Sequence, residues 1–257
     1  MGCILVGAEE RPTVVARKES DSDVPTITVM VALHNYRDLI LPCLDSVKLQ
    51  TLAALDLIIV DDASSDDSAT VVLGWLEKNH DRFENFQLLQ QPRNLGLANA
   101  RNTGFRHART EFVFVLDADN LIYPRCLQTL LVALQNCDAS FAYCYLEKFG
   151  DVSGLQNTRP WNAHLLQHGN FIDAMVLLRK SVWEIVAGYA VDMPIMGWED
   201  FDLWFRIAKI GGWGVQVPEV LARYRVSRRS MLHRRTNKKV QGLWSYLREK
   251  HPESFWV

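Results

Sequence analysis

Two aspartates separated by one residue follow an apolar run in the stretch FVFVLDADN, from Phe112 to Asn120. Residues two apart on an extended chain point to the same side, so Asp117 and Asp119 can converge on one ligand where a strand ends. Carboxylate oxygens suit Mg²⁺ or Mn²⁺ carried on phosphate. The alternative is a pair of solvated loop acids or a turn, and it is the preceding apolar strand that favours a metal site.

A second pair of acids, Asp61 and Asp62, follows the apolar run LIIV in the same manner. A carboxylate at a strand end can accept a hydrogen bond from a nucleobase imide or from ribose hydroxyls. It can also cap the helix that follows, near Ser64. We favour the ligand role for Asp61, and both roles stay open for Asp62.

The segment RNLGLANARNTG, residues 93–104, places Gly96 where a helix is expected to begin and Arg101 within it. Glycine permits close backbone approach, a helix N-terminus attracts anions, and arginine forks onto phosphate. The segment is thus a candidate phosphate-binding element. The alternative is that Arg101 pairs with a strand-end aspartate and holds the architecture.

The sequence Trp198-Glu199-Asp200 stands at the expected start of another helix. A carboxylate there stays ionised in the field of the helix dipole and could take a proton from a hydroxyl nucleophile. The alternative is the ordinary preference of acids for a first helical turn.

A basic segment follows further on, because residues 223–239 hold eight arginines and lysines and no acid. Such a segment can be a solvated face, a nucleic-acid patch or a clamp for a phosphate leaving group. His233 lies inside it and is a candidate metal ligand.

These residues need an α/β scaffold, and the order of apolar runs predicts one. The runs are continuous rather than alternating, as in a parallel sheet covered by helices on both faces, and ligands bind such sheets at the carboxyl ends of the strands. We predict strands over 26–33, 55–62, 86–90, 112–117 and 140–147, and helices over 37–49, 64–80 (opened by a capping box at Ser64 and Asp67), 97–108 and about 197–212.

Composition limits the function. The formal net charge is −2, which does not favour nucleic acid as a partner, and the longest apolar runs are strand-length, too short to span a bilayer. The five cysteines form no C-x-x-C pair, which favours a reducing compartment. We predict a tail or linker over 1–23 and one domain over 24–257, with a nucleotide-binding half at about 24–120 and an acceptor half at about 121–257.

In their order, the segments VALHNY, IIVDDASSDDS, NLGLANARNTG, VLDADN and GWEDFDLW resemble the inverting family 2 glycosyltransferases, which have the Rossmann-like GT-A fold. The resemblance implies transfer of a sugar from a nucleotide diphosphate donor to an acceptor hydroxyl, with Mn²⁺ or Mg²⁺. It implies the following roles: catalytic, Asp200 and Glu199; nucleotide-sugar-binding, Ala32, Leu33, His34, Asn35, Tyr36, Asp61, Arg93, Asn94, Gly96, Arg101, Asp117 and Ala118; metal-binding, Asp119, Asp117 and His233; acceptor-binding, Trp198 and Asn170.

The resemblance also implies partners and a location. We expect a UDP-sugar as donor and a saccharide or lipid-linked saccharide as acceptor, in surface polysaccharide or glycoconjugate synthesis, with single rather than processive addition. We expect a cytoplasmic protein that works at the inner face of the membrane. We also expect that the chain can form part of a larger multidomain transferase. The rival readings are a non-catalytic sugar-nucleotide module and a nucleotidyltransferase, although the latter would need a glycine-rich loop after the first strand.

Overall fold

The computed structural model describes residues 11–19, 27–227 and 239–255. The strands are β1 (Thr13–Lys18), β2 (Ile27–Leu33), β3 (Asp56–Asp61), β4 (Phe86–Gln90), β5 (Phe112–Asp117), β6 (Leu121–Ile122), β7 (Phe141–Gly150), β8 (Gly154–Gln156), β9 (Leu177–Arg179) and β10 (Gly214–Val226). The α-helices are α1 (Ile40–Lys48), α2 (Ser68–Asn79), α3 (Leu97–His107), α4 (Cys126–Gln135), α5 (Lys180–Ile185), α6 (Glu199–Lys209) and α8 (Val240–Lys250). Short 3-10 turns are η1 (His80–Arg82), η2 (Ala163–His168) and η4 (Pro252–Phe255).

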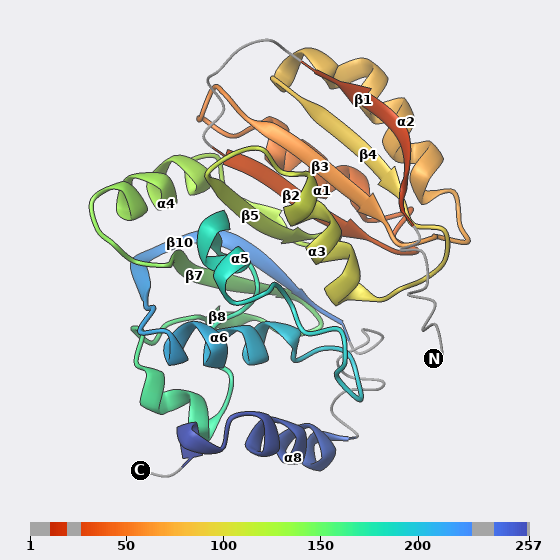
Figure 1. The fold of residues 1–257 in the computed structure, drawn as a ribbon. Coiled ribbons are helices and arrows are strands. Elements are labelled where there is room, and N and C mark those ends of the chain that lie inside the picture. The colour runs from red at the N-terminus through yellow and green to blue at the C-terminus, as the bar shows by residue number, and fades with distance from the viewer. Residues whose placement is uncertain (1–10, 20–26, 228–238, 256–257) are drawn as a thin grey trace, which may run out of the picture.

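Ten strands of the described chain form one sheet in the order β1-β4-β3-β2-β5-β9-β7-β10-β6, with β8 paired to β7 (Figure 1). Strands β4, β3, β2 and β5 run parallel to one another. Strand β9 is antiparallel to both β5 and β7, while β10 is parallel to β7. The expected mostly parallel α/β sheet is therefore confirmed, and its carboxyl-terminal edge gathers β2, β3 and β5.

Each face of the sheet buries its own core, which explains why the strands are apolar at consecutive positions. Val29 and Val31 of β2 pack in one cluster with residues of α1, α2 and α4. Met30 and Ala32 pack in the other with residues of α3 and α6. All seven residues of β2 are buried, as a strand covered on both sides requires.

Two predictions differ from the structure. Part of the expected tail, Thr13–Lys18, is a strand that pairs antiparallel with β4 at the edge of the sheet. Its β-branched residues favour a strand, but the polar residues on either side obscured this pattern in the sequence. Helix α2 begins at Ser68 rather than Ser64, and Asp67 makes no side-chain cap. Ser64 instead accepts a hydrogen bond from the Asn35 N–H at 2.9 Å, so it fastens two loops together.

Candidate active site

The polar clusters predicted at the strand ends meet at one edge of the sheet. In the register, Leu33 of β2 lies opposite Asp61 of β3, and Ala32 lies opposite Asp117 of β5. The residues that follow these strand ends are therefore neighbours in space. This convergence places the HNY loop beside the end of β3 and the D-x-D pair beside the end of β2.

Two cavities open at this edge. The first, of about 660 Å³, is lined by Arg101, Asp117, Lys148, Asn170, Asp173, Trp198, Glu199, Asp200 and Arg225, among others. The second, of about 470 Å³, is lined by His34, Asn35, Tyr36, Asp66, Asp119, Asp151 and Arg225, among others. Arg225, Val226 and Ser227 line both cavities, so the end of β10 separates two adjoining spaces. Asp117 faces the first space and Asp119 the second.

The D-x-D pair concentrates negative charge. Burial and the neighbouring Asp117 carboxylate raise the pKa of Asp119 to about 7. The backbone after the pair is held by Asn120, whose Oδ1 accepts from the Arg225 N–H at 2.8 Å. Arg225 in turn donates from Nε to the Asp119 carbonyl at 3.2 Å. The strand end is thus fixed to β10 while the two carboxylates remain at the cavities.

Arg101 forms an ion pair with a strand-end aspartate, which we considered above as the alternative to phosphate binding. Its Nη2 lies 2.9 Å from Asp117 Oδ1, and its Nη1 lies 3.0 Å from Glu199 Oε1. The side chain is only 3% exposed, and its charge is shared by these two acids. Arg101 therefore links the D-x-D strand to the start of α6, and its guanidinium is already engaged.

The loop before α3 is held by Asp62. Its two carboxylate oxygens accept from the N–H groups of Leu95 at 2.8 Å and of Gly96 at 2.7 Å. Gly96 has φ +91, which is a conformation that favours glycine. Asp62 thus supports the loop rather than facing a cavity.

Asp61 is fully buried, and both of its oxygens are bonded within the protein. Oδ1 accepts from the Ser64 N–H at 3.1 Å, and Oδ2 accepts from Gln90 Nε2 at 2.9 Å. Each oxygen thus accepts one hydrogen bond from the protein, and Asp61 lines neither cavity. The ligand role of Asp61 remains a prediction, and its bond to the Ser64 N–H belongs to the loop before α2 and does not cap that helix, which begins at Ser68.

Helix α6 presents two adjacent acids with different surroundings. Glu199 is 2% exposed, and its Oε2 accepts from the Gly197 N–H at 2.7 Å while Oε1 meets Arg101. Asp200 accepts from Asn170 Nδ2 at 2.9 Å and from the Phe201 N–H at 2.8 Å. Burial, followed by the nearby Glu199 and Asp173 carboxylates, raises the pKa of Asp200 to about 8. That value suits a general base near neutral pH.

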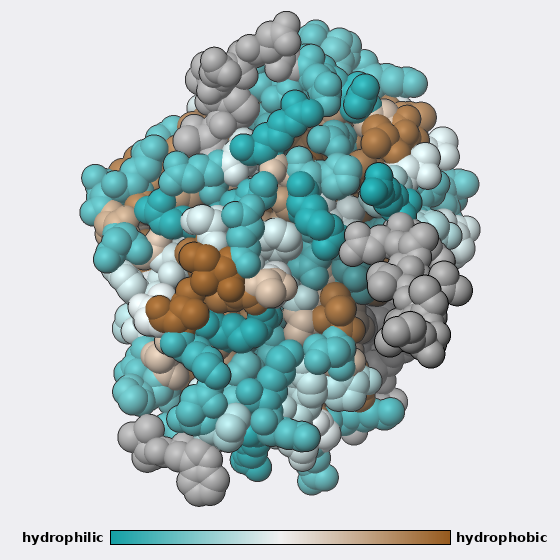
Figure 2. Space-filling model, in the orientation of Figure 1, coloured by the Kyte–Doolittle hydropathy of each residue, from teal (hydrophilic) through white to brown (hydrophobic). Residues whose placement is uncertain are grey.

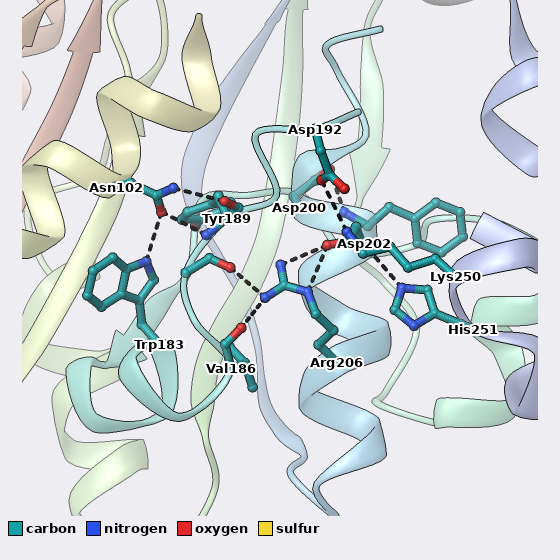
Figure 3. A network of polar contacts seen from close by, with 12 residues as sticks. Asn102, Trp183, Val186, Tyr189, Asp192, Asp200, Asp202, Arg206, Lys250 and His251 are labelled. Carbon is teal, nitrogen blue, oxygen red and sulfur yellow. Dashed lines mark hydrogen bonds and ion pairs between the residues drawn. The ribbon is translucent and has the colours of Figure 1, made fainter. Parts of the chain in front are cut away.

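The opposite side of α6 is anchored to the C-terminal helix (Figure 3). Asp202 is 0% exposed and lies 2.7 Å from Arg206 Nη2, 3.3 Å from Lys250 Nζ and 2.9 Å from His251 Nε2. Arg206 also donates to the carbonyls of Val186 and Gly188. Trp244 of α8 also packs edge-on against Trp198, which directly precedes α6, with ring centroids 5.3 Å apart. The helix that carries Asp200 is thus anchored near Trp198 and at Asp202.

The structure brings most of the predicted residues to the cavities, though not all of them. Those that line a cavity are His34, Asn35, Tyr36, Arg101, Asp117, Asp119, Asn170, Trp198, Glu199 and Asp200. Those that line neither are Ala32, Leu33, Asp61, Arg93, Asn94, Gly96 and Ala118. The proposed ligand His233 lies outside the described residues.

Sequence reasoning missed Asp173, Lys148 and Arg225 as individual cavity residues. Asp173 belongs to no motif, and its one signal is a single acid between apolar neighbours in NFIDAMVLL. Lys148 lies at a half-buried position on β7. Arg225 was noted only as one member of the basic segment.

The residues present fit a divalent cation in part. Asp117 and Asp119 supply hard oxygen donors where like charge and burial make a cation favourable. Within the described ranges there is no group of three or more His, Cys, Asp or Glu side chains that could hold a metal ion. Further ligands would therefore have to come from a bound substrate or from water, as is common for Mg²⁺.

Known proteins resemble this chain in sequence and in fold. The family model "Glycosyl transferase family 2" matches residues 28–191, and the chain belongs to that family. It is 32% identical to an uncharacterized glycosyltransferase, YibD, of Escherichia coli K12 over 118 residues. This alignment covers 46% of this chain and 33% of YibD. The chain is 33% identical to a GalNAc(5)-diNAcBac-PP-undecaprenol beta-1,3-glucosyltransferase of Campylobacter jejuni over 134 residues. This alignment covers 51% of this chain and 41% of that protein.

Two solved structures share the fold. The mannosyltransferase PcManGT of Pyrobaculum calidifontis, in complex with GDP-Man and Mn²⁺, superposes with a TM-score of 0.66 at 23% identity, over 93% of this chain and 65% of that one. TarS 1-349 of S. aureus, in complex with UDP-GlcNAc, gives 0.69 at 15% identity, over 81% and 61%. These matches confirm the GT-A fold that the motifs implied.

Two surface properties complete the description. None of the helices in the described residues is long and apolar enough to cross a membrane. The face shown in Figure 2 is mainly hydrophilic, with separate apolar patches. The most exposed large apolar side chains of the described residues include Ile185 and Leu49, at 67% and 65%.

Proposed function

We propose that this chain is an inverting glycosyltransferase that moves a sugar from a nucleotide diphosphate to an acceptor hydroxyl. The observation that carries the proposal is the first cavity, which has Asp117 of the D-x-D pair and Asp200 of α6 among its walls. Membership of glycosyl transferase family 2 supports it. A donor phosphate near the D-x-D pair would place its sugar in the same space as the acceptor.

In this mechanism Asp200 is the general base. Asn170 and the Phe201 N–H each donate to one of its oxygens, which orients the carboxylate. The acceptor O–H bond breaks as its proton moves to Asp200, and the acceptor oxygen bonds to the anomeric carbon. The bond from that carbon to the diphosphate oxygen breaks, and its electron pair leaves with the nucleoside diphosphate. A single in-line displacement of this kind inverts the anomeric centre.

The second cavity is assigned to the nucleotide and the first to the sugar and the acceptor. Tyr36 and Asp119 are walls of the nucleotide space, and Trp198 offers an apolar ring beside Asp200. Arg225 lines both spaces and would donate to the departing phosphate. Glu199 acts through Arg101 and the helix start, so we assign it a positioning role and leave proton transfer to Asp200.

Asp117 and Asp119 would hold Mn²⁺ or Mg²⁺. When bound, the ion would supply positive charge to the leaving diphosphate. The chain's own contribution is to keep both carboxylates at the cavity edge, through Arg101 and Asn120.

The substrates follow from the relatives as proposals. TarS is described with UDP-GlcNAc and PcManGT with GDP-Man, and we propose a UDP-sugar here. The name of the Campylobacter enzyme includes an undecaprenol-linked saccharide, which supports a saccharide or lipid-linked saccharide acceptor. We accordingly propose single addition in surface polysaccharide or glycoconjugate synthesis, in the cytoplasm at the inner membrane face. A larger multidomain transferase is a compatible setting.

The test is sugar transfer from a panel of UDP-, GDP- and dTDP-sugars with Mn²⁺, using saccharide and lipid-linked saccharide acceptors. Asp119→Ala is expected to weaken metal-dependent donor binding and to abolish transfer. Asp200→Asn is expected to abolish transfer while donor binding persists. Full transfer by Asp200→Asn would overturn the assignment of the base. Donor binding without any transfer would favour a non-catalytic module, and transfer of a nucleotidyl group would favour a nucleotidyltransferase.

A further inference from the structure

Asp173 lies in the wall of the first cavity and has no part in the mechanism above. It belongs to the irregular segment before β9, and this segment is held firmly in place. The Asp173 N–H donates to Asn157 Oδ1 at 2.9 Å, and Asp173 Oδ1 accepts from the Met175 N–H at 3.0 Å. Asn157 is itself 2% exposed. The carboxylate is therefore presented to the cavity by a fixed backbone.

The second oxygen of this carboxylate is available to a ligand. Across the described ranges no side chain or backbone N–H donates to Asp173 Oδ2, and the residue lines the cavity at a half-buried position. A carboxylate oxygen at a cavity wall that has no donor from the protein can accept a hydrogen bond from a hydroxyl of a bound ligand. The same cavity contains the Tyr224 side chain, which also has no hydrogen bond among the described residues. The wall thus offers hydrogen-bonding groups that the protein does not satisfy itself.

The charge around Asp173 indicates what kind of group it can bind. Asp117, Glu199 and Asp200 share the cavity, and Arg101 is committed to the first two of these. Burial, then the Asp117 carboxylate, raises the pKa of Asp173 to about 6. An anionic ligand group would meet repulsion here, whereas neutral hydroxyls donate well to a carboxylate.

The position of Asp173 also indicates which substrate it meets. Among the charged neighbours, the Asp117 carboxylate has the largest influence on Asp173, ahead of Arg101 and Glu199. Asp173 also raises the pKa of Asp200, after burial and Glu199. Asp173 shares the wall of the first cavity with Asp117 of the D-x-D strand end and with Asp200, the two groups between which the proposed mechanism places the transferred sugar.

We infer that Asp173 accepts hydrogen bonds from ring hydroxyls of the transferred sugar and so determines which donor sugar is used. The inference rests on the proposed function. It predicts that one hydroxyl of the sugar is coupled energetically to this carboxylate.

The experiment is a double-substitution cycle, which combines a change of the Asp173 side chain with the removal or inversion of one hydroxyl of the donor sugar. The donor is whichever sugar nucleotide of the panel the wild type transfers fastest, and its monodeoxy and epimeric analogues are compared in wild type and Asp173→Asn. Asp173→Asn, which keeps the shape and the Oδ1 acceptor, is expected to lower kcat/KM about tenfold or more, as for loss of a charge-assisted hydrogen bond. Removing the coupled hydroxyl should cost the wild type a similar factor and should cost the variant little.

The outcomes separate this inference from the proposed function. Transfer by wild type, with equal losses for every analogue in both proteins, would overturn the role of Asp173 and leave the transferase intact. No transfer by wild type from any donor would overturn both. Asp138→Asn, an exposed acid away from both cavities, is the matched control and should leave the whole pattern unchanged. If Asp173→Asn lowers Tm strongly, Asp173→Glu serves in the same cycle, because it keeps the charge and displaces the carboxylate.

Discussion

Arg101 of α3 and Glu199 of α6 form a buried ion pair, with Nη1 3.0 Å from Oε1, although 98 positions separate them in the chain. The same guanidinium holds Asp117, so one side chain connects the strand end that we propose for the metal to the helix of the proposed general base. The distance between the two halves of the proposed mechanism thus depends on a single buried cation.

Replacing Arg101 by Met is expected to destabilise the protein by about 3–5 kcal/mol, because two buried carboxylates lose their counter-charge. Urea unfolding measures this loss. Arg106→Met, at an exposed position of the same helix, is the control and should stay within about 0.5 kcal/mol. Similar stability of the two variants would show that Arg101 does not hold the site together.

Asp200→Asn should stabilise the protein increasingly as the pH rises. The folded pKa of Asp200, about 8, is raised above the ordinary value, so ionising this carboxyl costs stability as the pH climbs from about 4 through 8. Asparagine has no charge to bury. Thermal unfolding of both proteins at pH 5 and pH 9 tests this, and a gain in Tm that does not grow with pH would contradict it.

The transfer rate should have an acid limb set by Asp200, because the base acts only when it is deprotonated. We expect kcat/KM to rise with pH toward the pKa of about 8. Asn170→Ala removes the 2.9 Å hydrogen bond to the carboxylate, which favours the charged form. The limb should therefore move to higher pH in this variant. A limb near pH 4 in wild type would exclude Asp200 as the group that titrates.

Asp202→Asn should destabilise the protein at neutral pH by about 3 kcal/mol or more, because Arg206, Lys250 and His251 lose their shared anion. Burial opposes ionisation of Asp202, but the His251 hydrogen bond and the Arg206 and Lys250 charges hold its pKa below the usual range. Its contribution is present above about pH 4 and is lost as the pH falls through the folded pKa. Urea unfolding at pH 7 and well below pH 4 should show the variant's deficit shrinking in acid.

Gly104→Ala should destabilise the packing of α3 on β2. An added Cβ would lie 2.2 Å from Met30 Cγ, so either the side chain or the helix must move, at a cost of about 1–3 kcal/mol. Gly74→Ala in α2 is the matched control, since nothing lies within 4 Å of its added Cβ. That control should gain about 0.5–1 kcal/mol from helix propensity. Chemical denaturation of the two variants should give shifts of opposite sign.

Local pattern was sufficient for the strands and for the edge where they end. The continuous apolar runs before Asp61 and Asp117 predicted parallel strands buried on both faces, and the structure confirms them. The strand Thr13–Lys18 was missed because an edge strand needs apolar residues on only part of its surface, and charged flanks made it resemble a linker.

The sequence by itself determined the fold class and the convergence of HNY and D-x-D at one edge, because short continuous apolar runs predict parallel strands that are buried on both faces. The family was indicated by the resemblance of the ordered motifs. Only the tertiary structure decided which acids reach a cavity. Asp61 and Asp62 are bonded within the protein and line neither cavity, whereas Asp173, Glu199 and Asp200 line the first one. The physical reason is that the partners of a buried carboxylate come from segments far apart in the chain, and their packing leaves no local pattern.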